Sequence, residues 1–518
     1  MISRSHPKTS EFGDFQTPAA VTQTICRLLA ERGSAPASVI EPTCGIGNFL
    51  LSALNEFSSV KRALGIEINQ TYADKVSAAV RARPDSNKVQ IVRDSFFSID
   101  VGKLLRDLPE PILAIGNPPW ITNSQLSVLG SANVPTKANF QHYDGLAALT
   151  GKSNFDISEW ILVRLLELLQ GRRAELAMLC KTAVARKMLL HAWKNHINLA
   201  GSEIRAIDAP AVFGAAVDAC LLFCSLVPSS SACDCQVFRQ LEDRNPETSI
   251  GFHNGLLIAD VAAFNQWRHL IGEEDVYKWR SGIKHDCAKV MELRKEGSRY
   301  RNGLEEVLDV EDDYVYPMLK SSELANGRID GGNRWMVVIQ RNVGDDTKII
   351  RHLAPKTWKY LEEHSELLDG RVSSIYRNRP RFSVFGVGEY SFSPWKVAIS
   401  GFYSNLHFAA IGDDGGKPMV FDDTCYFVAC YNEEEAKFVA SLLNAPVTRE
   451  FFSAFIFWDA KRPVTTDVLQ RLNLLALARE VGEGDRMSGH WEKRKSEASS
   501  GQREHSHRCE LSDILIIR

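Results

Sequence analysis

The amino-acid sequence predicts an α/β fold for the N-terminal part of the chain and a mixed α+β fold for the remainder. Up to about residue 230, short apolar runs of strand length alternate with amphipathic stretches of helical length. This order builds a parallel sheet with crossover helices. Beyond residue 230, strands and turns follow one another without that alternation. We therefore expect domains at 1–230 and 231–478, followed by a polar tail at 479–518.

Composition narrows the class of protein. Hydrophobic residues make up 44% and charged residues 24% of the 518 positions, which is typical of a soluble globular protein. The net charge of −3 excludes a globally basic nucleic-acid binder but leaves room for a local basic patch. No run of about 18 apolar residues and no signal peptide occurs, so we expect a cytoplasmic protein. The eleven cysteines have neither disulfide nor zinc-ligand spacing, which predicts reduced thiols and no metal.

The first expected helix begins after a polar segment. Thr17 resembles an N-cap, with Pro18 at the first helical position and Gly33 as the stop signal. The preceding residues 12–16 are too polar to be core. We expect this segment, which includes Phe15, to line a pocket.

A glycine-bearing loop follows the first expected strand. Residues 38–41 read as a strand that runs into Pro42-Thr43-Cys44-Gly45-Ile46-Gly47-Asn48, and a helix follows from Phe49. In a strand, loop and helix of this kind, backbone N–H groups can approach a ligand closely. The pattern favours a nucleotide-like ligand, and the alternative is a plain tight turn.

Acidic residues end the next two expected strands. Glu67 closes the strand at 63–68, about 20 residues after the glycine loop, where nucleotide-binding units place an acid that accepts both ribose hydroxyls. The strand at 89–93 is followed by Asp94, which could accept from an adenine amino group, and by Phe96, which could cover the ring. The alternative for Glu67 is an exposed surface glutamate.

The segment Asn117-Pro118-Pro119-Trp120 follows an apolar run at 111–115. Two prolines hold the backbone rigid and aim its carbonyls. The Asn117 side-chain oxygen and the Pro118 carbonyl could together accept both hydrogens of an amine on a planar base, on which Trp120 would stack. The alternative is a proline-rich turn beside a core tryptophan. The four strand ends fall on one edge of a parallel sheet, where open α/β sheets bind ligands.

Further strands are expected after the long polar loop at 122–152. A helix from Ser153 precedes a strand at 174–180, and strands at 203–209 and 219–227 are too close for a helical crossover, which predicts an antiparallel hairpin. Phe213 lies between them. It is core by default, or the second wall of an aromatic clamp that faces Trp120.

These motifs together resemble the γ group of DNA adenine-N6 methyltransferases of restriction-modification systems. In this group the cofactor motifs come first, Asn-Pro-Pro-aromatic next and the target-recognition region last. The resemblance implies a Rossmann-like seven-stranded methyltransferase domain, S-adenosylmethionine as cofactor and no metal. It implies catalytic roles for Asn117, Pro118, Pro119, Trp120 and Phe213. It implies cofactor contacts for Phe15, Thr17, Pro18, Glu41, Thr43, Cys44, Gly45, Gly47, Asn48, Glu67, Asp94, Phe96 and Asn117. Trp120 stands where Tyr or Phe is more usual.

The resemblance also implies an activity. A methyl group would pass from S-adenosylmethionine to N6 of an adenine flipped out of duplex DNA, which marks the site against a cognate restriction endonuclease. Methylation of an RNA base or of a protein glutamine stays open, because Asn-Pro-Pro-aromatic serves any planar amine. A non-catalytic DNA specificity subunit is the alternative from another class.

The C-terminal part contains a segment in which arginines alternate with aromatic residues. Such residues can neutralise phosphates and read guanine edges. We expect DNA contacts from Arg371, Tyr376, Arg377, Arg379 and Arg381, and the alternative is a solvated basic hairpin. No nuclease motif stands out, so a cognate endonuclease would be a separate partner of this monomer. The polar composition of 479–518 predicts disorder.

Overall fold

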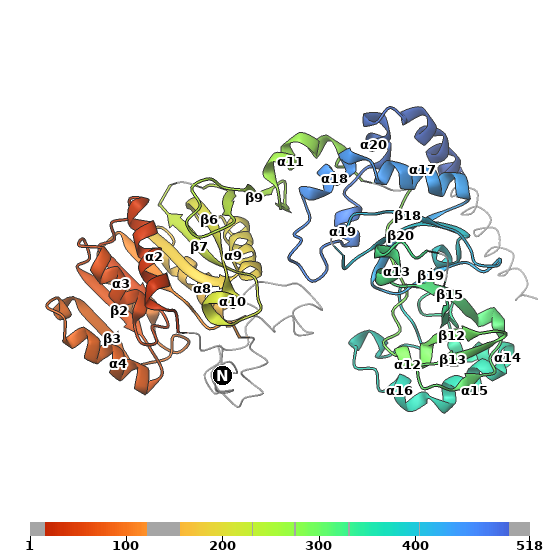
Figure 1. The fold of residues 1–518 in the computed structure, drawn as a ribbon, viewed down its shortest axis with the longest axis horizontal. Coiled ribbons are helices and arrows are strands. Elements are labelled where there is room, and N and C mark those ends of the chain that lie inside the picture. The colour runs from red at the N-terminus through yellow and green to blue at the C-terminus, as the bar shows by residue number, and fades with distance from the viewer. Residues whose placement is uncertain are drawn as a thin grey trace, which may run out of the picture. The chain divides into compact units, whose positions relative to one another are not determined.

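The computed structural model describes residues 16–121, 156–229, 231–273, 276–329, 332–403 and 405–496. The chain divides into two compact units, Met1–Ala262 and Ala263–Arg518 (Figure 1). None of the helices in these ranges is both long and apolar enough to span a membrane.

One mixed sheet of ten strands forms the centre of the first unit, in the order β10-β9-β8-β6-β7-β5-β4-β1-β2-β3. Strands β1 to β5 are mutually parallel, and β7 runs antiparallel to both β5 and β6, which confirms the expected hairpin. The strands are β1 Ser38–Glu41, β2 Arg62–Ile66, β3 Val89–Val92, β4 Ile112–Gly116, β5 Ala174–Lys181, β6 Leu199–Ile207, β7 Ala219–Leu226, β8 Asp234–Phe238, β9 Thr248–His253 and β10 Leu256–Ile258.

The sheet is larger than the expected seven strands. Strand β8 pairs in parallel with β6, and β9 and β10 continue the same edge. The boundary expected at residue 230 is therefore displaced, and the first unit ends at Ala262. Pairing of β8 with β6 is a long-range choice that no local pattern of these short strands specifies.

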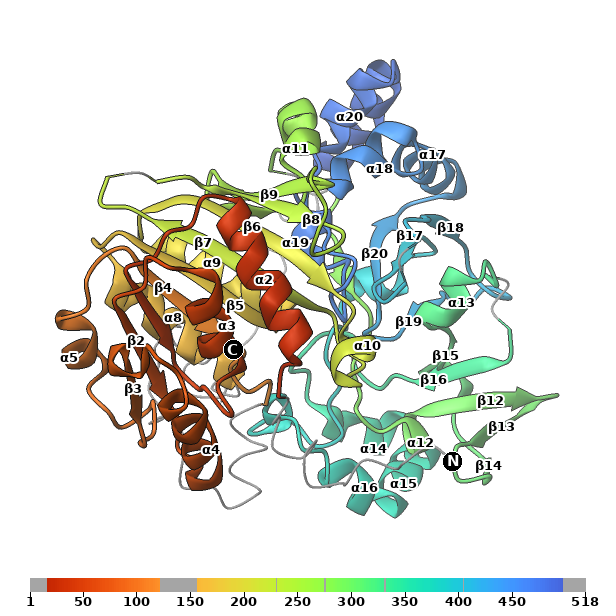
Figure 2. The ribbon, with the colours of Figure 1, turned by 60° about the vertical axis from the view of Figure 1, so that its left-hand side comes forward.

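Helices cover both faces of this sheet. Helices α2 Ala19–Glu31, α3 Asn48–Glu56 and α4 Gln70–Arg81 lie on one face, and α5 Val101–Arg106, α8 Ile157–Leu169 and α9 Thr182–Lys194 on the other (Figure 2). The short α10, Ala209–Phe213, links β6 to β7. Pro18 rather than Thr17 is the N-cap of α2. Asp156 caps α8, and the expected cap Ser153 lies outside the described residues.

The second unit contains two smaller sheets. A four-stranded sheet has the order β11-β20-β17-β18, and a six-stranded sheet has the order β14-β13-β12-β16-β15-β19. The strands are β11 Arg280–Ser281, β12 Glu292–Glu296, β13 Arg299–Asn302, β14 Val307–Leu308, β15 Val315–Leu319, β16 Arg334–Val337, β17 Trp395–Ser400, β18 Ala409–Ile411, β19 Val420–Phe421 and β20 Cys425–Cys430. The helices are α11 Val261–Trp267, α12 Ala288–Met291, α13 Ser321–Ala325, α14 Ile350–Leu353, α15 Pro355–Glu363, α16 Ser365–Asp369, α17 Glu433–Leu443, α18 Pro446–Ser453, α19 Thr466–Leu469 and α20 Leu474–Glu480.

The start of the polar tail is ordered, contrary to the expectation from composition. Residues 484–496 form a helix. Arg494 anchors it: the guanidinium donates to both carboxylate oxygens of Glu435, at 2.5 and 3.1 Å, and lies over the rings of Tyr277 and Tyr431. Because a single half-buried arginine supplies this contact, average composition does not reveal it. Residues 497–518 lie outside the described ranges.

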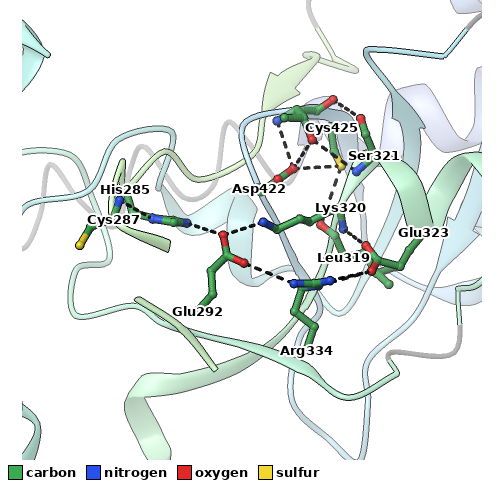
Figure 3. A network of polar contacts seen from close by, with 11 residues as sticks. His285, Cys287, Glu292, Leu319, Lys320, Ser321, Glu323, Arg334, Asp422 and Cys425 are labelled. Atoms are coloured by element: carbon green, nitrogen blue, oxygen red, sulfur yellow. Dashed lines mark hydrogen bonds and ion pairs between the residues drawn. The ribbon is translucent and has the colours of Figure 1, made fainter. Parts of the chain in front are cut away.

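A half-buried carboxylate, that of Glu292, links residues of three strands or strand ends of the six-stranded sheet (Figure 3). Glu292 on β12 accepts from Lys320 Nζ at 2.6 Å and lies 3.4 Å from His285 Nε2 and from Arg334 Nη1. Burial alone would raise the pKa of Glu292, but hydrogen bonds from His285 and Lys320 outweigh it and lower the pKa to about 2.

Glu292→Gln is expected to lower the free energy of unfolding of the protein at pH 7. A carboxyl whose pKa is lower when folded stabilises the fold above its unfolded value of 4.5 and stops doing so as the pH falls towards about 2. The loss should be at most about 3 kcal/mol, and it should shrink in that acidic window. Urea denaturation at several pH values measures it. The exposed pair Arg351–Glu362 provides the control, since Glu362→Gln should leave the free energy of unfolding nearly unchanged.

Candidate active site

The glycine loop and the acid after β2 lie together at the carboxyl edge of the first sheet. The Gly45 N–H donates to Glu67 Oε2 at 2.7 Å, and the Asn69 N–H donates to Glu67 Oε1 at 2.6 Å. Glu67 is only 8% exposed. Gly45 and Gly47 have φ values of 53° and 84°, the left-handed region that glycine adopts without strain. The glycine loop and the turn after β2 therefore each donate one backbone N–H to the Glu67 carboxylate.

Residues just before α2 connect the glycine loop to the Asn-Pro-Pro segment. Gln16 Oε1 accepts from the Ile46 N–H at 3.2 Å, and the Thr17 carbonyl accepts from Asn48 Nδ2 at 2.7 Å. Thr17 Oγ1 accepts from Asn117 Nδ2 at 3.2 Å. Thr17 therefore links Asn117 to Asn48 at the end of the glycine loop. Phe15 lies outside the described residues.

Buried polar groups surround the start of the loop. Glu41, 3% exposed, accepts from the Leu50 N–H at 2.9 Å, and burial raises the pKa of its carboxyl well above the usual value. Burial also raises the pKa of the Cys44 thiol, which therefore stays protonated at neutral pH. The buried Thr43 Oγ1 has no hydrogen-bond partner among the described residues. Because an unsatisfied buried hydroxyl is costly, this atom is poised to bond a polar group of a bound ligand.

Gly47→Ala is expected to destabilise the first unit more than a positive φ alone explains. A Cβ at position 47 would lie 2.3 Å from Val76 Cγ2 on the neighbouring α4. The loss in unfolding free energy should be about 1–2 kcal/mol for the backbone plus about 1–3 kcal/mol for the clash. Gly171→Ala is the matched control, because its φ is 78° and an added Cβ meets no atom within 4 Å. Equal losses for the two variants in urea denaturation would contradict the close packing.

The residues after β3 are placed only partly as expected. Asp94 is exposed, and its Oδ1 accepts from the Ser95 N–H at 2.7 Å. Phe96 is 5% exposed and packs edge-on against Trp160 of α8, with ring centroids 6.2 Å apart. The ring is committed to this contact instead of lying open to cover a ligand, which the sequence pattern did not reveal. Ile68, directly after Glu67, is a large apolar residue that is 49% exposed. Its place next to Glu67 is the one signal in the sequence that could have indicated it as a residue that contacts a ligand.

Trp120 and Phe213 are brought together, but not as an open clamp. Their ring centroids are 5.1 Å apart and their planes 75° apart, so the rings touch edge to face and leave no slot for a base. Trp120 is 7% exposed and belongs to a core cluster that also holds Leu179. Its Nε1 donates to the Leu179 carbonyl at 3.4 Å. Pro118 is buried and Pro119 half-buried beside it.

The arginine-rich segment of the second unit separates into structural and exposed residues. Arg371 donates to the backbone carbonyls of Leu368, His285 and Ser383, at 2.7, 3.1 and 2.7 Å, and stacks on Tyr376. These bonds use Nε and Nη1 of the guanidinium, so Arg371 and the half-buried Tyr376 hold the loop in shape, and their contact with DNA stays a prediction.

The remaining arginines of that segment are at the surface. Arg377, Arg379 and Arg381 are exposed. Arg381 forms an ion pair with Asp369 at 2.7 Å, whereas the other two have no ion pair among the described residues. All three arginines are accessible for contact with phosphates, and Arg381 would exchange its bond to Asp369 for one to a phosphate.

Comparisons with known proteins identify related methyltransferases. No family model matches the chain. The chain is 45% identical over 481 residues to the type II methyltransferase M.NspV of Nostoc sp. (strain ATCC 29411 / PCC 7524), which covers 93% of this chain and 100% of that protein. The fold is similar to that of the type IIL restriction-modification enzyme MmeI, solved in complex with DNA, with a TM-score of 0.52 over 87% of this chain at 13% identity. The match spans 64% of the MmeI chain, less than two thirds of it.

The cofactor follows from the family and from the site. S-adenosylmethionine is the methyl donor of these enzymes. The glycine loop, the strand-end carboxylate of Glu67 and the unsatisfied Thr43 hydroxyl fit a ligand with amino, carboxylate and ribose groups. The 45% identity over nearly the whole chain establishes that this protein belongs to the type II methyltransferases, the DNA-methylating enzymes of restriction-modification systems.

Proposed function

We propose that the protein transfers a methyl group to N6 of adenine at specific sites in duplex DNA, as the modification component of a restriction-modification system. The observation that carries this proposal is the placement of Asn117. Its Nδ2 donates to Thr17 Oγ1, and the Thr17 carbonyl accepts from Asn48 at the end of the glycine loop. Because the two ends of an amide point apart, this bond directs Oδ1 away from Thr17.

The cofactor would be held by residues from three strand ends. Glu67 accepts the ribose hydroxyls in place of its present bonds to the Gly45 and Asn69 N–H groups. Asp94 accepts from the adenine amino group of the cofactor, and the exposed Ile68 covers the ring. The Thr43 hydroxyl bonds the methionine end. When bound, S-adenosylmethionine supplies a sulfonium methyl, whose transfer removes its positive charge.

The target base is held by the Asn-Pro-Pro segment. Asn117 Oδ1 and the Pro118 carbonyl accept the two hydrogens of N6 and turn the nitrogen lone pair out of the ring plane, towards the methyl group. A strong base is not required, because the amino proton becomes acidic only after the methyl has moved. Extrusion of the base costs a few kcal/mol, and stacking on Trp120 would offset about 1–3 kcal/mol. Since Trp120 and Phe213 are now in contact, the rings must separate to admit the base.

Duplex DNA as the substrate is supported by the exposed arginines of the second unit. Arg377, Arg379 and Arg381 can neutralise backbone phosphates and retain the double strand while one base is extruded. We propose that the enzyme acts as a monomer and that a cognate restriction endonuclease is a separate protein.

Incorporation of labelled methyl groups from S-adenosylmethionine into duplex DNA, RNA and protein tests the substrate class. The proposal predicts label in duplex DNA alone. Label in RNA or in protein glutamine would contradict the proposal and identify that molecule as the substrate. Absence of transfer to all three, with S-adenosylmethionine failing to bind in calorimetry, would indicate a specificity subunit without catalysis.

A further inference from the structure

We propose that Lys181 is a positioning residue for the reaction: it fixes the backbone of Trp120 so that the indole ring can open to receive the target base without moving Asn117. This inference rests on the proposed function, which assigns Trp120 to the base. Lys181 is the last residue of β5 and the N-cap of α9. Its Nζ donates to the Trp120 carbonyl at 3.1 Å and to Asp156 Oδ2 at 2.7 Å.

The end of β5 holds Trp120 at two separate points. Lys181 binds the backbone carbonyl of Trp120, and the Leu179 carbonyl on the same strand accepts from its Nε1 at 3.4 Å. The next residue is fixed as well, because the Ile121 carbonyl accepts from the Ile157 N–H at 2.9 Å. The chain is therefore pinned immediately after the indole, and the rigid prolines fix it immediately before.

Asp156 holds the Lys181 ammonium in place beside the Trp120 carbonyl. This carboxylate is 7% exposed and caps α8, where its Oδ1 accepts from the Ser158 N–H at 3.1 Å and from the Ser158 hydroxyl at 2.5 Å. Its other oxygen binds Lys181, whose side chain is 28% exposed. A buried carboxylate needs a partner, and an ammonium with three donors can serve it and a carbonyl at once.

The reaction requires such a fixed point. To admit a base, the indole of Trp120 must leave its edge-to-face contact with Phe213. If the Trp120 backbone moved with the ring, the Asn117 and Pro118 acceptors a few residues upstream would shift too. A misplacement of about 1 Å at the reacting groups can lower a rate by about 10²-fold. Lys181 confines the change to the side-chain torsions of Trp120.

The test compares Lys181→Met, Lys181→Arg, Asp156→Asn and the double variant Lys181→Met with Asp156→Asn. Readouts are kcat and KM for duplex DNA, S-adenosylmethionine affinity by calorimetry, and 2-aminopurine fluorescence at the target adenine. Lys187→Met is the matched control, since Lys187 lies on α9 and binds Glu159 at 3.0 Å, away from Trp120.

We expect Lys181→Met to lower kcat by about 10- to 100-fold and to change the 2-aminopurine signal, with cofactor affinity retained. Asp156→Asn keeps the Trp120 contact and should retain most of kcat, as should the Lys187→Met control. The double variant removes the unpaired buried carboxylate yet still lacks the carbonyl contact, so kcat should stay low. Lys181→Arg should restore much of it.

Recovery of kcat in the double variant would overturn the inference, because Lys181 would then only neutralise Asp156. Unchanged kcat and fluorescence in Lys181→Met would overturn it as well. If Lys181→Met fails to fold, the double variant and Lys181→Arg carry the test. Failure of the proposed function looks different, because the unmodified enzyme itself would then leave adenine unmethylated.

Discussion

Asn117→Ala is expected to lower kcat for methyl transfer by on the order of 10²–10³-fold, the loss that follows removal of one hydrogen-bonding group directed at a reacting centre. Without Oδ1, one hydrogen of the target amine has no acceptor, and the lone pair is no longer turned towards the methyl group. The bond from Nδ2 to Thr17 Oγ1 is lost too, but Thr17 keeps its carbonyl bond to Asn48. Cofactor affinity should therefore persist.

Single-turnover methylation of a duplex oligonucleotide measures the effect, with calorimetry for the cofactor. Asn195→Ala is the control, because Asn195 is exposed at the C-terminus of α9 and bonds only the neighbouring His191 among the described residues. A variant at position 117 that methylates as fast as the control would refute the role of Asn117 as an acceptor.

Glu67→Gln is expected to weaken S-adenosylmethionine binding by about 10²-fold, since two charge-assisted hydrogen bonds at about 1.5–3 kcal/mol each become weaker or are lost. The amide keeps the volume of the carboxylate but offers one acceptor where the ribose hydroxyls need two. The same carboxylate holds the Gly45 N–H at 2.7 Å, so the glycine loop should loosen as well. Isothermal titration calorimetry measures the dissociation constant.

Glu56→Gln provides the comparison for Glu67→Gln. Glu56 is the last residue of α3, is exposed, and lies on the same βα unit. Its substitution should leave cofactor affinity within about twofold. Equal affinity in the two variants would exclude Glu67 as a ribose ligand.

The edge of the first sheet could be predicted from the sequence because parallel strands carry their carboxyl ends to the same side. Gly45, Glu67 and Asn117 are far apart in the chain, yet each follows a short apolar run. Once β1, β2 and β4 pair in parallel, these residues must meet. Local pattern and topology agree here. The bonds by which Thr17 joins Asn117 to Asn48 are seen only in the folded chain.

Other features depend on long-range contacts that no local pattern encodes. Arg371 resembles a phosphate ligand in the sequence, but its guanidinium donates to three backbone carbonyls, one of them that of the distant His285. Arg494 lies in a polar stretch and orders a helix by pairing with the buried Glu435. Phe96 turns to Trp160 because α8 packs beside it. In each case one side chain finds its partner only in the folded chain.

Mass spectrometry of nucleosides tests most directly whether the Asn117 and Pro118 acceptors grip an extruded adenine beside the methyl donor. Duplex DNA would be incubated with S-adenosylmethionine and either the unmodified enzyme or Asn117→Ala, then digested to nucleosides. We expect N6-methyladenine from the unmodified enzyme and only background from the variant. Methylcytosine in place of N6-methyladenine, or N6-methyladenine at equal levels from both proteins, would contradict it.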